Sequence, residues 1–74
     1  MTNHSIKIAV SSVSFSKNES LRQTLKLAYS NSVFNDTGQL IQGDALREFI
    51  CDADVVIAGT EVFTLDVLEG AKSL

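Results

Sequence analysis

The chain has 74 residues, of which 45% are hydrophobic, and carries a formal net charge of −3. This length allows one domain at most, and the composition excludes a disordered or low-complexity chain. Because the charge is negative and no basic stripe is present, we expect neither a nucleic acid nor a membrane as a partner.

The first predicted elements are a buried strand and an amphipathic helix. The strand is IKIAV, residues 6–10, with Ile6, Ile8 and Val10 on one face and Ala9 on the other, as in a largely buried strand. After the polar loop SSVSFSKNE, Ser16 and Glu19 have the spacing of a capping box, which predicts a helix over residues 17–29. The apolar stripe of this helix consists of Leu21, Leu25 and Ala28.

A second strand and a second helix follow. NSVFND predicts a short strand that ends at the turn former DTG. Either Gly43 or Asp44 is expected to cap the next helix. Its apolar residues have the i, i+3, i+4, i+7 spacing of one helical face: Leu46, Phe49, Ile50 and Ala53. We expect Phe49 to be buried between this helix and the sheet.

The third strand and the third helix close the series. DVVIAG, residues 54–59, is a continuous apolar run, which is typical of a parallel strand covered on both faces. Thr64 is expected to cap a helix over residues 64–72, with Asp66 in its first turn to complement the helix dipole. The residues that line the faces of this helix are Leu65, Leu68 and Ala71 or Lys72.

The alternation of short apolar strands with amphipathic helices defines the expected fold class. Such alternation predicts right-handed crossovers and a parallel sheet with helices on both sides. We therefore expect an α/β protein, an incomplete flavodoxin-like three-layer sandwich with a parallel sheet in β-α-β-α-β-α order. Residues 1–74 would form a single partial domain without a nucleotide-binding domain.

Three features of the sequence bear on the compartment. Cys51 is the only cysteine, so it cannot form an internal disulfide, and this fits a reducing environment. The opening MTNHSIKIAV lacks a charged segment followed by a long apolar one, as a secretion signal would have. The longest apolar stretch, VVIAG, is too short to span a bilayer. We expect a cytoplasmic protein.

The sequence offers no metal site and no phospho-acceptor site. His4 and Cys51 are its only soft metal ligands, and neither belongs to a ligand-spaced motif. Cys51 has no basic neighbour to lower its pKa, so we expect a partly exposed, inert thiol. A receiver domain shares the expected topology but needs acidic residues after the first strand, where this chain has Ser11 and Ser12.

Polar residues follow the first and third strands, at the edge where ligands bind in open α/β sheets. They are Ser11, Ser12 and Ser14 after the first strand, and Gly59, Thr60 and Glu61 after the third. These residues either solvate the loops and cap the helices or face a ligand. The loop SSVSFS lacks the glycines of the known phosphate-binding loops.

The segment ALREFICDADVVIAGTEVFTLDVLEGAKSL, residues 45–74, resembles the substrate domain of the D-isomer-specific 2-hydroxyacid dehydrogenases, the phosphoglycerate dehydrogenase-like family. The resemblance extends over residues 40–74, and KIAVSSVSF fits the first strand of the family more loosely. Two positions depart from the family pattern. Val62 stands where related sequences often have proline, and Ala58 stands where the phosphoglycerate branch has a substrate-binding arginine. The second departure argues against phosphoglycerate as the substrate.

The resemblance implies a function for the parent enzyme: hydride transfer between NAD and a small 2-hydroxy or 2-oxo acid. The residues that it implies near the substrate are Ala58, Gly59, Thr60, Ser11 and Ser12. The family's glycine-rich NAD fingerprint and its catalytic arginine, glutamate and histidine have no counterpart in this sequence. We therefore expect a truncated piece of the substrate domain, with no catalytic residue and no cofactor of its own.

An alternative function is non-enzymatic. The chain could be a small flavodoxin-like interaction module that self-associates through its open sheet edge. The third strand would supply that edge, because residues 55–58 contain neither a charge nor a proline to block pairing with another chain. Self-association through this strand is expected under either function.

Overall fold

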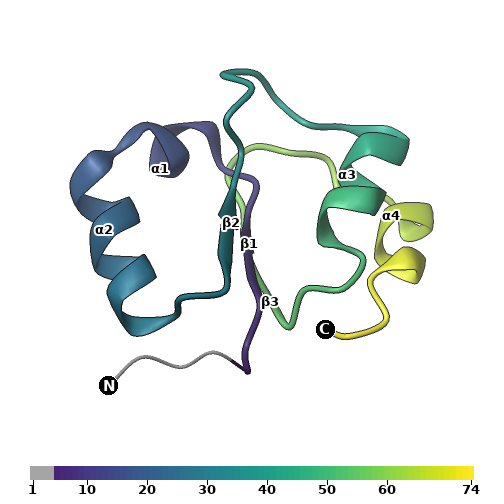
Figure 1. The fold of residues 1–74 in the computed structure, drawn as a ribbon. Helices are drawn as coiled ribbons and strands as arrows, with labels where there is room; N and C mark the ends of the chain where they lie inside the picture. The colour runs from purple at the N-terminus through teal and green to yellow at the C-terminus, as the bar shows by residue number, and fades with distance from the viewer. Residues whose placement is uncertain (1–4) are drawn as a thin grey trace.

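In the computed structural model, which describes residues 5–74, three short strands alternate with helices (Figure 1). The strands are β1 (Ile8–Val10), β2 (Ser32–Phe34) and β3 (Val55–Ile57). The helices are α1 (Val13–Lys17), α2 (Glu19–Ala28), α3 (Gly43–Ile50) and α4 (Leu65–Gly70). His4, considered above as a metal ligand, lies outside the described residues.

The sheet is open and parallel, with the strand order β2-β1-β3. In the register of the sheet, Ile8 of β1 is paired with Ser32 of β2 and with Val55 of β3. Figure 1 shows α1 and α2 on one face of the sheet and α3 and α4 on the other. The predicted three-layer α/β architecture is confirmed, and the strand order is the one with which flavodoxin-like sheets begin.

The hydrophobic core lies between the sheet and the α3–α4 layer. It comprises the buried residues Ala9, Leu46, Ile50, Ala53, Val67 and Ala71. The predicted helical face is thus confirmed for Leu46 and Ile50, whereas Ala53 is buried in the same core but lies after the end of α3 at Ile50. Phe49, which was expected to be buried, is only partly buried and packs against the rim of this core.

The predicted helix over residues 17–29 is wrong in its start, because the structure has two helices that meet at Asn18. Asn18 is extended, with φ −86° and ψ 105°, and its side chain accepts a hydrogen bond from Leu21 N at 3.1 Å. Ser16 therefore does not form the predicted capping box with Glu19. It lies inside α1 and is buried, and its hydroxyl donates to Val10 O at 3.2 Å.

The outer layer on this face of the sheet is loosely packed. Helix α2 has no buried residue, and Leu21 of the predicted apolar stripe is 43% exposed. Leu25 is half-buried and Ala28 is exposed. The periodicity therefore predicts the existence of the helix, while the small sheet covers only part of its apolar face.

Of the two other predicted helix caps, one is confirmed and one is wrong. Thr64 caps α4 as expected, and its hydroxyl accepts from Val67 N at 3.3 Å. Helix α3 begins at Gly43, but its cap is Gln42, which makes no side-chain capping bond. Gly43 instead provides a positive φ of 59°, which glycine adopts at little cost. The predicted cap at Gly43 or Asp44 is wrong.

The C-terminal elements are less covered than their sequence suggests. In β3, Val55 is 43% exposed, so the predicted cover on both faces is incomplete. In α4, Val67 is buried while Leu65 and Leu68 are exposed. No helix within residues 5–74 has the length and apolar character needed to cross a membrane.

Candidate functional site

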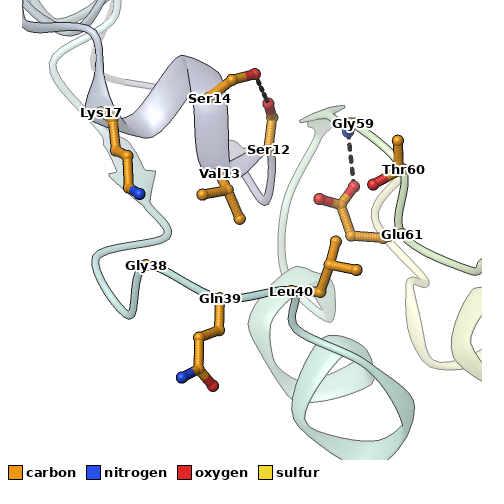
Figure 2. Close-up of a pocket in the computed structure, with 10 residues that line it drawn as sticks. All are labelled: Ser12, Val13, Ser14, Lys17, Gly38, Gln39, Leu40, Gly59, Thr60 and Glu61. Carbon is orange, nitrogen blue, oxygen red and sulfur yellow. Dashed lines mark hydrogen bonds between the residues drawn. The ribbon is translucent and has the colours of Figure 1, made fainter.

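A pocket of about 480 Å³ lies where the loops that follow the three strands meet (Figure 2). The carboxyl ends of parallel strands share one edge of the sheet, and this edge is where open α/β sheets bind ligands. The residues that line the pocket are Ser12, Val13, Ser14, Lys17, Gly38, Gln39, Leu40, Gly59, Thr60 and Glu61.

The first wall is the turn from β1 into α1. The amides of Ser11 and Ser12 both donate to Ile57 O, at 3.0 and 3.3 Å, and thus fix this turn to the end of β3. The Ser12 hydroxyl accepts from Phe15 N at 3.2 Å and so caps α1. It also lies 3.3 Å from the Ser14 hydroxyl. The predicted capping role of this serine-rich loop is confirmed for Ser12.

The second wall is the loop after β3, which Glu61 folds back onto the strand ends. Glu61 Oε2 accepts from Gly59 N at 2.6 Å and from the Ser11 hydroxyl at 3.2 Å. Gly59 allows the two loops to come close, since a Cβ there would lie 3.3 Å from Ser12 Oγ. These bonds hold the Glu61 carboxylate against the edge of the sheet, with only 9% of the residue exposed.

The third wall is the segment after β2, which Asn35 secures. The Asn35 amide nitrogen Nδ2 donates to Ser11 O at 3.1 Å and to Gln39 O at 2.7 Å. Its oxygen Oδ1 accepts from the Thr37 amide and hydroxyl. Gly38, with a positive φ of 76°, completes the turn that brings Gln39 to the pocket. One buried side chain therefore connects two of the three walls.

The pocket contains one basic and one acidic side chain. Lys17, at the end of α1, is exposed, and none of the three ion pairs within residues 5–74 includes it. Glu61 lies on the other side of the opening in Figure 2. Its second oxygen, Oε1, has no hydrogen-bond partner and is the one buried side-chain polar atom in the described part of the chain for which this holds.

Of the five residues that the family resemblance implied near the substrate, the structure brings three to the pocket. Ser12, Gly59 and Thr60 line the pocket. Ser11 lies behind them, fully buried, and supports Glu61. Ala58 is exposed but is not part of the pocket lining.

The pocket also contains residues that were not among those five. Glu61 directly follows Thr60, so its position beside a strand end was visible in the sequence, but its inward direction depends on the fold. Lys17 was expected to begin a helix. It enters the pocket because α1 starts four residues earlier, at Val13.

The residues at the first helix do not fit the pyrophosphate of NAD. Dinucleotide sites place a glycine-rich turn and a free helix N-terminus against the phosphates. Here the turn after β1 contains no glycine, and the Ser12 side chain already occupies the start of the five-residue helix α1. Within residues 5–74, no group of three or more histidine, cysteine, aspartate or glutamate side chains could hold a metal ion. Cys51 is a free, exposed thiol.

No known protein family, curated protein or solved structure matches this chain.

Proposed function

We propose that the chain is the N-terminal part of the substrate domain of an NAD-dependent D-2-hydroxyacid dehydrogenase of the phosphoglycerate dehydrogenase-like type. In this function it supplies one wall of the site for a small 2-hydroxy or 2-oxo acid. One observation carries the proposal: Ser12, Gly59 and Thr60, which the resemblance implied near the substrate, line one pocket at the ligand-binding edge of the sheet.

The role of this wall would be to position the acid. The exposed Lys17 ammonium offers a positive charge to a carboxylate, and the hydroxyls of Ser14 and Thr60 offer hydrogen bonds. NAD and the groups that transfer hydride and proton would belong to other parts of the enzyme. The chain by itself would bind the acid weakly and would not oxidise it.

An NMR titration of the ¹⁵N-labelled chain tests this function. We expect D-lactate to shift the amide signals of Ser12, Gly59 and Thr60, and NAD to leave them unchanged. Lys17→Met should weaken the binding of D-lactate about tenfold, because a carboxylate loses its charge partner. Lys72→Met, which removes an equal charge outside the pocket, is the matched control.

Three results would contradict this function. One is micromolar binding of NAD to the isolated chain, since the residues at α1 do not fit its pyrophosphate. The second is an absence of acid-induced shifts at the pocket, and the third is an equal loss of affinity in both lysine variants.

A second candidate function is self-association of a non-enzymatic interaction module. The exposed apolar residues of the C-terminal segment favour it: Val55 at the sheet edge, and Val62, Leu65 and Leu68 after it. Because β3 is an edge strand within the described sheet, a second copy of the chain could add its own β3 there.

Light scattering at micromolar concentration tests the self-association that this second function requires. We expect a dimer, which Val55→Lys should weaken. Leu21→Lys is the matched control, since Leu21 on α2 is equally exposed, at 43%. A well-folded chain that stays monomeric at all concentrations would contradict it.

A further inference from the structure

The unpartnered oxygen of Glu61 points to a specific kind of ligand group. Only 9% of Glu61 is exposed, and its Oε1 has no donor within hydrogen-bond distance. A carboxylate oxygen can only accept hydrogen bonds, and a buried acceptor without a donor is costly. In Figure 2 this oxygen is directed into the space between Val13 and Leu40, which is the interior of the pocket.

The protein itself does not provide a donor for this oxygen. The Ser11 hydroxyl and the Gly59 amide both donate to the other oxygen, Oε2. Within residues 5–74, Glu61 belongs to no group of three or more histidine, cysteine, aspartate or glutamate side chains that could hold a cation. The described residues thus supply no donor to Oε1, and a molecule in the pocket that satisfies this oxygen has to be a hydrogen-bond donor.

Building on the function proposed above, we propose that Glu61 makes the pocket selective for the 2-hydroxy form of the acid over the 2-oxo form. The carboxylate of the acid would face Lys17, while its hydroxyl would donate to Glu61 Oε1. The ketone of a 2-oxo acid has lone pairs and no proton, so it would place a second acceptor against a buried acceptor. Sites that need a substrate hydroxyl discriminate strongly against analogues without one.

The affinities of the labelled chain for D-lactate and pyruvate, measured by NMR titration, test this inference. We expect D-lactate to bind about tenfold more tightly than pyruvate. Glu61→Gln should abolish or reverse this preference, because its amide oxygen can accept from Ser11 and Gly59 while its NH₂ group donates to the ketone. Glu69→Gln, an equal change of charge on an exposed residue outside the pocket, should retain the preference of the wild-type chain.

The outcomes separate this inference from the function on which it rests. Binding of pyruvate at the same amides with equal or higher affinity overturns the selectivity and leaves the substrate wall intact. Binding of neither acid overturns both. Tighter binding of D-alanine than of D-lactate overturns the assignment of a hydroxyl, because Glu61 would then select an ammonium group. The wild-type ratio decides the inference even where Glu61→Gln fails to fold.

Discussion

At the scale of single residues, the end of the sheet opposite the pocket is held by charge. Lys7 Nζ forms an ion pair with Asp52, and the Lys7 amide donates to Asp54 Oδ2 at 2.9 Å. Lys7 O in turn accepts from the amides of Asp54 and Val55. The hydrogen bond from Lys7 is the main reason that the pKa of Asp52 lies below its ordinary value of 3.8.

This lowered pKa predicts a weak acid dependence of stability. A carboxyl group with a depressed pKa stabilises the fold above its unfolded pKa, and the contribution is lost as the pH falls through the folded pKa. We expect the contribution of Asp52 to fade as the pH falls below about 4, the pKa of an aspartate in the unfolded chain, and to be lost at the lower pH where Asp52 of the folded chain is protonated. The effect should be small because Asp52 is exposed and screened by solvent.

Thermal melts of the wild-type chain and of Asp52→Asn between pH 2 and pH 7 check this prediction. The difference between the two melting temperatures should shrink as the pH falls. Asp66→Asn controls for the general effect of removing an exposed acid from an ion pair, since Asp66 pairs with Arg47. A difference that stays constant down to pH 2 would show that the Lys7–Asp52 pair contributes nothing to stability.

At the scale of elements, three helix starts differ in how they are capped, and their stabilities should differ accordingly. Asn18 and Thr64 accept hydrogen bonds from backbone amides of α2 and α4, whereas Gln42 makes no such bond to α3. We expect Asn18→Ala and Thr64→Ala each to cost about 1 kcal/mol of unfolding free energy. Gln42→Ala should cost close to nothing.

Urea unfolding of the three alanine variants measures these differences directly. The Gln42 variant is the internal control, because it makes the same kind of change at a cap without a bond. Equal losses in all three variants would mean that these positions act through general packing or propensity rather than through capping.

The strand order could be predicted from the sequence, but the packing details could not. Apolar runs and helical spacing identify β1, α3 and β3, and right-handed crossovers then restrict the topology. The spacing of Ser16 and Glu19 matches a capping box, yet Asn18 is the residue that caps α2. Tertiary contacts decide between them: Ser16 bonds to Val10 O and to Asn35 N, and local spacing contains no information about either partner.

The pocket shows the same division between local pattern and tertiary contact. That Ser12, Gly59 and Thr60 would lie near the ligand edge followed from their positions after strands. The same reasoning placed Glu61 at this edge, but its inward direction depends on the fold of the loop, and Lys17 reaches the pocket only because α1 begins at Val13. The contribution of the segment after β2 depends on Asn35, which the sequence presents as an ordinary turn residue.

At the scale of the whole molecule, the two helical layers are unequal. The α3–α4 layer contributes Leu46, Ile50 and Val67 to the core, whereas α2 has no buried residue. Elements with few buried apolar contacts open locally at lower free energy than the rest of a fold. We therefore expect α2 to open without global unfolding.

Amide hydrogen exchange tests this prediction. The amides of α2 should exchange faster than those of α3, and their exchange should depend weakly on low concentrations of urea. Leu46→Ala should lower the protection of α3 and of the sheet, because truncating a fully buried leucine costs about 2–5 kcal/mol. Equal protection of α2 and α3 in the wild-type chain would show that the two layers unfold together.

The bonds of Glu61 have a further consequence for the evolution of such pockets. The Gly59 amide and the Ser11 hydroxyl form a small anion receptor, and the protein fills it with its own carboxylate. A single-base change can turn a glutamate codon into one for alanine or glycine. Glu61→Ala would expose both donors and invert the polarity of the site, so that an external formate or phosphate could take the vacated position. One mutation thus separates a pocket that binds hydrogen-bond donors from a pocket that binds anions on the same fold.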